Sequence, residues 1–261
     1  MITDDVAPLR HDVEPWFMSG FDFRCIWEAL GLDHLPFPLA YRNRQKYMWQ
    51  VEADRKDALA RQREDLNENR VRILEALRFP AFMIMGFGRI GHGADEELYR
   101  LFGVIGTRGY GAVITQDPSE QTIFGGDIQI IGCVNVDFPQ VVLEALPDCK
   151  SGKRPRREAR LEDETPADFF RESKINVSIL LGGSADFTLD YELRNANYLT
   201  LVNVADDGAY VVHEGTEAFQ IVPATVRSLL DTFQKVEELH LKAAKERLAE
   251  ARSEQDFSGI S

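Results

Sequence analysis

Two stretches of the chain share one layout and decide the fold: VNVDFPQVVLEAL (134–146) and FQIVPATVRSLL (219–230). In each, an apolar strand-like run gives way, next to a proline, to a segment with apolar residues at helical spacing. Several short apolar runs separated by turn residues precede both stretches. An order of helix, strands and helix therefore occurs twice, over about residues 66–146 and 166–245.

This repeat predicts an α+β fold of two quasi-symmetric halves, with a mostly antiparallel sheet, flanking helices and a long C-terminal helix. Residues 1–261 are treated as a single domain. The polar, mixed-charge residues 147–165 are expected to form an exposed linker between the halves. A helix is expected at 166–181, and Pro223 is expected in the first turn of the C-terminal helix.

The first 80 residues are predicted to be mostly helical. Ser19 is a suitable N-cap for a helix that Gly31 would end, and the charge-rich residues 49–78 would form two helices divided at 67–69. The stretch EPWFMS (14–19) is interpreted as a short first strand.

Composition limits the class of partner. The formal net charge of -13 argues against nucleic acid, because phosphate binding needs a basic face. No apolar run approaches the length of a membrane span, so no membrane insertion is expected. The acidic N-terminal residues lack the apolar stretch of a signal peptide. Three cysteines without metal-type spacing indicate reduced thiols in a cytoplasmic protein and no metal site.

The stretch MIMGFGRIGHG (83–93) places Gly86, Gly88 and Gly91 in the spacing of a dinucleotide-binding loop. Such a site needs a strand, the loop and a helix in succession, with an acidic residue about 20 positions later. Residues 110–132 instead resemble hairpin strands, and the acidic residue is missing. No cofactor is therefore expected, and the glycines are interpreted as a long, flexible connection between two strands. An NAD(P)-dependent oxidoreductase remains the enzyme alternative.

No other catalytic pattern emerges from the sequence. His213 and Glu214 lack the second histidine of a zinc protease motif. Ser184 in LGGSAD lacks the glycine spacing of a nucleophile elbow. The chain is accordingly predicted not to be an enzyme. A third possibility is a non-secretory adaptor whose long C-terminal helix self-associates, although the charged stretch after His240 keeps few apolar positions.

Four motifs, in order, resemble the EspG-like chaperones of type VII (ESX) secretion. FDFRCIWEALGLDHLPFPL (21–39) resembles the family's tryptophan-containing helix, followed by Leu-Gly and a Leu-Pro-x-Pro-Leu-like segment. The other three are IGTRGYGAVITQDP (105–118), VVLEALPDCKSGKRP (141–155) and LVNVADDGAYVV (201–212), in which Ala209 replaces the arginine usual in the family.

The resemblance implies a cytosolic, non-enzymatic chaperone. Members of the family bind PE–PPE-type heterodimers at the hydrophobic tip of the PPE helical bundle, keep them soluble and deliver them to the ESX secretion machinery. They bind through the sheet surface, the C-terminal helices and the loop between the second and third strands. In this sequence that loop would be GFGRIGHGADEE (86–97). The resemblance thus implies these partner-binding residues: Phe87, Arg89, Ile90 and His92 in the loop, and Val226 and Phe233 in the C-terminal helix.

Overall fold

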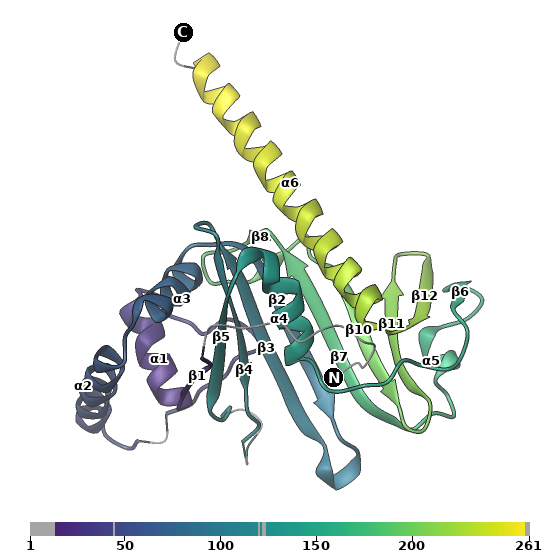
Figure 1. Cartoon of the computed structure of the whole chain (residues 1–261), viewed down its shortest axis with the longest axis horizontal. Helices are drawn as coiled ribbons and strands as arrows, with labels where there is room; N and C mark the ends of the chain where they lie inside the picture. The colour runs from purple at the N-terminus through teal and green to yellow at the C-terminus, as the bar shows by residue number, and fades with distance from the viewer. Residues whose placement is uncertain (1–13, 44, 120, 122–123, 259–261) are drawn as a thin grey trace.

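The computed structural model of the chain describes residues 14–43, 45–119, 121 and 124–258, and its side chains as far as Glu246. The N-terminal residues considered as a signal peptide thus lie almost wholly outside the described residues. The α+β fold is confirmed: helices flank one large antiparallel sheet (Figure 1). The helices are α1 (Gly20–Ala29), α2 (Met48–Glu64), α3 (Glu68–Arg78), α4 (Phe138–Ala145), α5 (Pro166–Phe169) and α6 (Val226–Ser258).

Ten strands form the large sheet, in the order β1-β5-β4-β3-β2-β7-β10-β11-β12-β6. Their bounds are β1 (Trp16–Met18), β2 (Pro80–Ile90), β3 (Glu97–Gly106), β4 (Tyr110–Gln116), β5 (Ile128–Val134), β6 (Arg157–Arg160), β7 (Ile175–Ser184), β10 (Asn197–Val204), β11 (Gly208–Glu214) and β12 (Ala218–Pro223). Two further strands, β8 (Asp186–Phe187) and β9 (Leu193–Arg194), form a small hairpin.

The sheet contains two four-stranded meanders joined at its centre, and β1 and β6 form its two edges. Strands β2 to β5 lie on one side, β7, β10, β11 and β12 lie on the other, and each meander is followed by a helix, α4 or α6. Strands β2 and β7 pair through eight registered residue pairs, from Met83–Ser184 to Ile90–Val177. The predicted twofold relation between the halves stays a prediction.

Glycine allows the two central strands to approach closely. A Cβ atom added to Gly88 would lie 2.0 Å from the backbone oxygen of Ser178 in β7. One added to Gly86 would lie 2.9 Å from Cδ2 of Leu181. The first two glycines of the G-x-G-x-x-G spacing therefore belong to strand β2, where they leave room for the neighbouring strand. The interpretation of this segment as a long, flexible connection was wrong.

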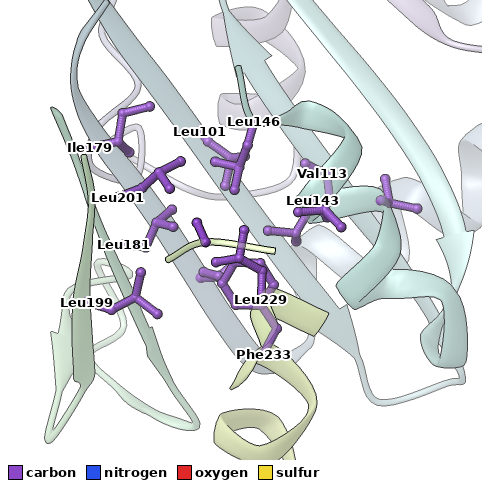
Figure 2. Close-up of a cluster of buried hydrophobic side chains, with 14 of the residues drawn as sticks. Leu101, Val113, Leu143, Leu146, Ile179, Leu181, Leu199, Leu201, Leu229 and Phe233 are labelled. Atoms are coloured by element: carbon purple, nitrogen blue, oxygen red, sulfur yellow. The ribbon is translucent and has the colours of Figure 1, made fainter. Parts of the chain in front are cut away.

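The main hydrophobic core lies between one face of the sheet and helices α4 and α6. Figure 1 shows both helices across this face, with α6 extending beyond the sheet. Figure 2 shows Leu229 and Phe233 of α6 facing leucines of the sheet, among them Leu181. Because successive residues of a strand point to opposite faces, Leu101 contributes to this core while Phe102 contributes to a second one.

The second core lies on the opposite face, beneath α1 and α3. The segment containing β8 and β9 reaches this core from the second meander. The ring centroid of Tyr191 lies 5.1 Å from that of Trp27 and 6.2 Å from that of Phe102. The Tyr191 hydroxyl donates a hydrogen bond of 2.6 Å to the carbonyl oxygen of Leu77, and burial raises the pKa of Tyr191 to about 12. One side chain thus ties the second meander to the core of the first.

Most local predictions for the N-terminal third are confirmed. The Ser19 side chain accepts the N–H of Asp22 at the start of α1. Gly31, just beyond that helix, has a φ of +83°, a conformation that glycine adopts readily. The charge-rich region divides into α2 and α3, where Asn67 caps the second helix. The stretch EPWFMS contains the short strand β1.

The helix predicted at 166–181 was wrong. Only α5, four residues long, is helical there, and residues 175–181 belong to β7. The apolar residues Ile175, Val177, Ile179 and Leu181 alternate at the spacing of a strand. The β-branched side chains among them favour this conformation.

Residues 147–165 contain one strand, and their role as a linker between the halves stays a prediction. They include β6, which pairs with β12, and the N–H of Gly152 donates to the carbonyl oxygen of Ala209. Pro223 ends β12 and does not lie in the first turn of α6. The Thr225 hydroxyl, which accepts the N–H of Ser228, caps that helix instead.

Gly88→Ala is expected to destabilise the fold by about 3 kcal/mol, because the added methyl group cannot be placed without moving the backbone of β7. Thermal and urea denaturation measure this loss. Gly215→Ala is the matched control, since its Cβ would be 3.2 Å from the nearest atom, the Ala218 oxygen. Equal stability of the two variants would contradict the close approach of the central strands.

Glu237 makes stability depend on pH. Its carboxyl group lies in the apolar space beneath α6, and burial, with Glu238 nearby, raises its pKa from 4.5 to about 7. Between these two values the folded chain binds more protons than the unfolded chain, so stability falls as the pH rises and stays lowered above pH 7. Glu237→Gln should therefore raise the melting temperature at pH 8 and change it little at pH 4.5. Asp231→Asn, exposed on the same helix, should show no such difference.

Candidate protein-binding surface

Among the described residues, the helices on the second face leave the middle of the sheet partly exposed. Over the first meander this face carries α1 and α3, and over the second it carries a third cluster that includes Phe170 and Tyr210. Between them lie four apolar side chains from β2, β7 and β10, called here the central strip: Met85, Phe87, Leu180 and Tyr198. Leu180 is 41% exposed and Tyr198 is 47% exposed, although each belongs to a central strand.

The register of the strands makes the strip continuous. Phe87 of β2 is paired with Leu180 of β7, so that the two side chains are direct cross-strand neighbours. In the adjacent row Met85 is paired with Gly182, which is paired in turn with Tyr198. These rows form an apolar surface that crosses the junction of the two meanders.

Gly182 provides the space in which the Tyr198 ring lies. A Cβ atom at this position would be 2.5 Å from Cε1 of Tyr198 and 3.5 Å from Cε of Met85. The ring therefore lies over the glycine, which gives it a fixed position on the sheet surface. A fixed aromatic side chain loses little conformational entropy when a partner covers it.

Charged groups lie at the β2–β3 end of the strip. Arg89 is two residues beyond Phe87 on the same face, and its guanidinium lies 3.0 Å from a carboxylate oxygen of Glu96. Arg100 is paired with Phe87 across β2 and β3 and is buried, which lowers its pKa. The exposed Arg89–Glu96 pair therefore gives this end of the strip the polar border typical of a protein interface, whereas Arg100 is buried beside Phe87.

The structure divides the six predicted contact residues among three environments. Phe87 and Arg89 share the uncovered face, and His92 is exposed in the short turn after β2. Ile90 points to the opposite face and packs against the main core. Val226 and Phe233 are buried in that core beneath α6, so neither is on the surface of the free chain.

Leu180 and Tyr198 were not identified from the sequence as contact residues. In INVSILL (175–181), the buried positions alternate with Asn176, Ser178 and Leu180. Leu180 is thus an apolar residue in an otherwise polar row, which is the signal that would have identified it. Tyr198 carries no comparable signal, because its place beside Met85 depends on the pairing of distant strands.

The glycine motif does not form a phosphate-binding loop. Gly86 and Gly88 lie within β2, between β3 and β7, and the element that follows the turn is strand β3 instead of the helix that a dinucleotide site requires. The N–H of Gly91 donates to the carbonyl oxygen of Asn176. Among the described residues, no three histidine, cysteine or acidic side chains are grouped as metal ligands. None of the helices in that part of the chain is both long and apolar enough to span a membrane.

A partly exposed apolar strip on a sheet is typical of a surface that binds a partner. Comparison with known families agrees with this class. The EspG family model matches residues 21–178, and the chain belongs to the EspG family. No curated protein matches the chain in sequence.

The fold is similar to that of a solved chaperone structure. This is the structure of the Mycobacterium tuberculosis type VII secretion system chaperone EspG5 in complex with a PE25–PPE41 dimer. The TM-score is 0.57 at 11% sequence identity, and the match covers 86% of this chain and 96% of the EspG5 chain. Together with the family match, this likeness confirms the type of fold that the sequence motifs implied.

Neither NADH nor NADPH is expected to stabilise the protein. A melting curve recorded with millimolar nucleotide should coincide with that of the free chain, because the motif's first two glycines are part of the central sheet. A saturable upward shift in melting temperature would restore the oxidoreductase alternative. Since Gly88→Ala itself alters the fold, the wild-type chain is the form to test.

Proposed function

We propose that this chain is a cytosolic chaperone for PE–PPE-type heterodimers that leave the cell by type VII secretion. Family membership and the likeness to EspG5, whose structure is that of a complex with a PE25–PPE41 dimer, support the class of client. The central strip, an apolar surface that the described helices leave partly exposed, is the observation that carries the proposal. This role requires no catalytic residues and no cofactor.

The physical basis is competition for an apolar surface. A helical bundle with an exposed apolar tip associates with its own copies through that tip. A chaperone that covers the tip lowers the concentration of free tips by mass action, without chemical work. The ESX secretion machinery would then receive a client that is still soluble.

Within this proposal, Phe87, Leu180 and Tyr198 contact the client's apolar tip, and Arg89 and His92 bind at the polar edge. Aromatic side chains and arginine contribute strongly at protein interfaces. Arg89 already pairs with Glu96, so it offers an oriented charge at the border. Ile90, Val226 and Phe233 contribute indirectly by supporting the sheet from its other face.

The test begins with a pull-down from native cytoplasm, using a tag on the N-terminus of the full chain. The expected result is a stoichiometric PE–PPE-type pair that stays bound during gel filtration and is identified by mass spectrometry. A chain that elutes alone under the same conditions would contradict the proposed function.

Leu180→Lys is expected to weaken binding of the captured pair about tenfold or more, because it places a charge in the apolar centre of the contact. The melting temperature should change little, since Leu180 is 41% exposed and a lysine amino group at this position can reach solvent. Val136→Lys is the matched control, because Val136 is 80% exposed but lies outside the strip. Titration calorimetry with the purified pair measures both affinities, and equal affinities would exclude the strip as the contact surface.

A further inference from the structure

The segment between α1 and α2 holds an aromatic side chain against the central strip. Phe37 is 53% exposed, although Pro36, Pro38 and Leu39 on either side of it are buried. Its ring centroid lies 5.1 Å from that of Phe87, at a tilt of 59°. An apolar ring placed beside the strip and left half exposed adds apolar surface that the fold itself does not bury.

Side-chain hydrogen bonds on both sides of Phe37 hold the backbone of its segment in place. On one side, the indole N–H of Trp27 donates to the carbonyl oxygen of His34 at 2.7 Å. On the other, Gln116 at the end of β4 accepts the N–H of Ala40 at 2.9 Å and donates to the Ala40 oxygen at 2.7 Å. Gln116 is 4% exposed and therefore acts from beneath the segment.

The hydrogen bonds at Trp27 and Gln116 and the contact between Phe37 and Phe87 together determine the shape of the binding surface. Phe37 comes from the layer above the sheet, whereas Phe87 and Leu180 belong to the sheet itself. Phe37 therefore adds an aromatic ring from outside the sheet to the apolar surface of the strip. Because the segment is held at both ends, little entropy is lost when a partner contacts the ring.

We infer that Phe37 is a client-contact residue and that Gln116 positions it. The partner is the apolar helical tip that the central strip accepts, so this inference rests on the proposed function. The contact extends recognition beyond the sheet and the β2–β3 turn to the α1–α2 segment. A client tip must then fit against the tilted rings of both Phe37 and Phe87. The surface would thus select clients by the shape of the tip as well as by its apolar character.

Phe37→Ala should weaken binding of the captured PE–PPE-type pair about tenfold, with the melting temperature nearly unchanged. Phe17→Ala is the matched control, because Phe17 is 67% exposed on β1 and makes no part of the strip. Its affinity should stay within about twofold of the wild type. Calorimetric titration of all variants with the same purified pair provides the comparison.

The role of Gln116 is tested with a double-mutant cycle. Gln116→Leu removes both hydrogen bonds to Ala40, together with the one that Gln116 donates to the Gly126 carbonyl oxygen at 3.2 Å, and should weaken client binding although its side chain is buried. Combined with Phe37→Ala, it should cause little further loss, because both changes remove the same contact. Purely additive losses would overturn the positioning role, since a general structural defect would weaken binding whether or not the Phe37 ring is present.

The outcomes separate this inference from the proposed function. If Leu180→Lys abolishes binding while Phe37→Ala leaves it at the wild-type level, the client uses the strip alone and the inference is wrong. If the wild-type chain captures no such pair, the proposed function fails first. Weaker binding of the client by Phe37→Ala, with wild-type binding by Phe17→Ala, supports the inference.

Discussion

The pairing of β2 with β7 is the interaction on which the rest of the structure depends. It joins two meanders into one sheet, and it requires Gly86 and Gly88 where any larger side chain would meet the neighbouring strand. The helices then follow from the sheet. Among the described residues, α4 and α6 cover one face across the junction, whereas α1, α3 and the cluster around Tyr210 cover the sides of the other. The uncovered strip is therefore a direct result of how the meanders meet.

The strip differs from an accidental apolar patch because independent parts of the chain support it. Cross-strand register aligns Phe87 with Leu180, and Gly182 makes space for the ring of Tyr198. Arg89 and Glu96 form an ion pair at its border. The main core behind the sheet keeps this arrangement rigid, because buried leucines fill the space beneath α6 (Figure 2). A rigid apolar surface suits a chaperone, since binding a client then requires little ordering of the chaperone itself.

Local sequence signals predicted most elements whose cause is local. Ser19 and Gly31 mark the ends of α1, and Asn67 separates two helices, because caps act within a few residues. The glycines of β2 were interpreted wrongly because the need for glycine comes from a distant part of the chain. At Gly88 it is the close backbone of Ser178, about ninety residues away, that leaves no room for a side chain. Phe87 and Arg89 were selected as loop residues and lie in a strand instead. Leu180 and Tyr198 were not predicted, because the sequence does not show which part of the sheet the helices leave exposed. Leu180 does, however, interrupt a row of polar residues in β7.

The anchor at Tyr191 has a consequence for synthesis on the ribosome. Its hydroxyl donates to the carbonyl oxygen of Leu77, and its ring completes a cluster begun by Trp27. During translation the first meander leaves the exit tunnel well before residue 191 is added, so its aromatic cluster stays incomplete while the second meander is being made. The nascent chain thus exposes apolar rings for several seconds at ordinary elongation rates. Cotranslational folding of the two meanders is therefore coupled, and a fragment that ends before β8 lacks part of its own core.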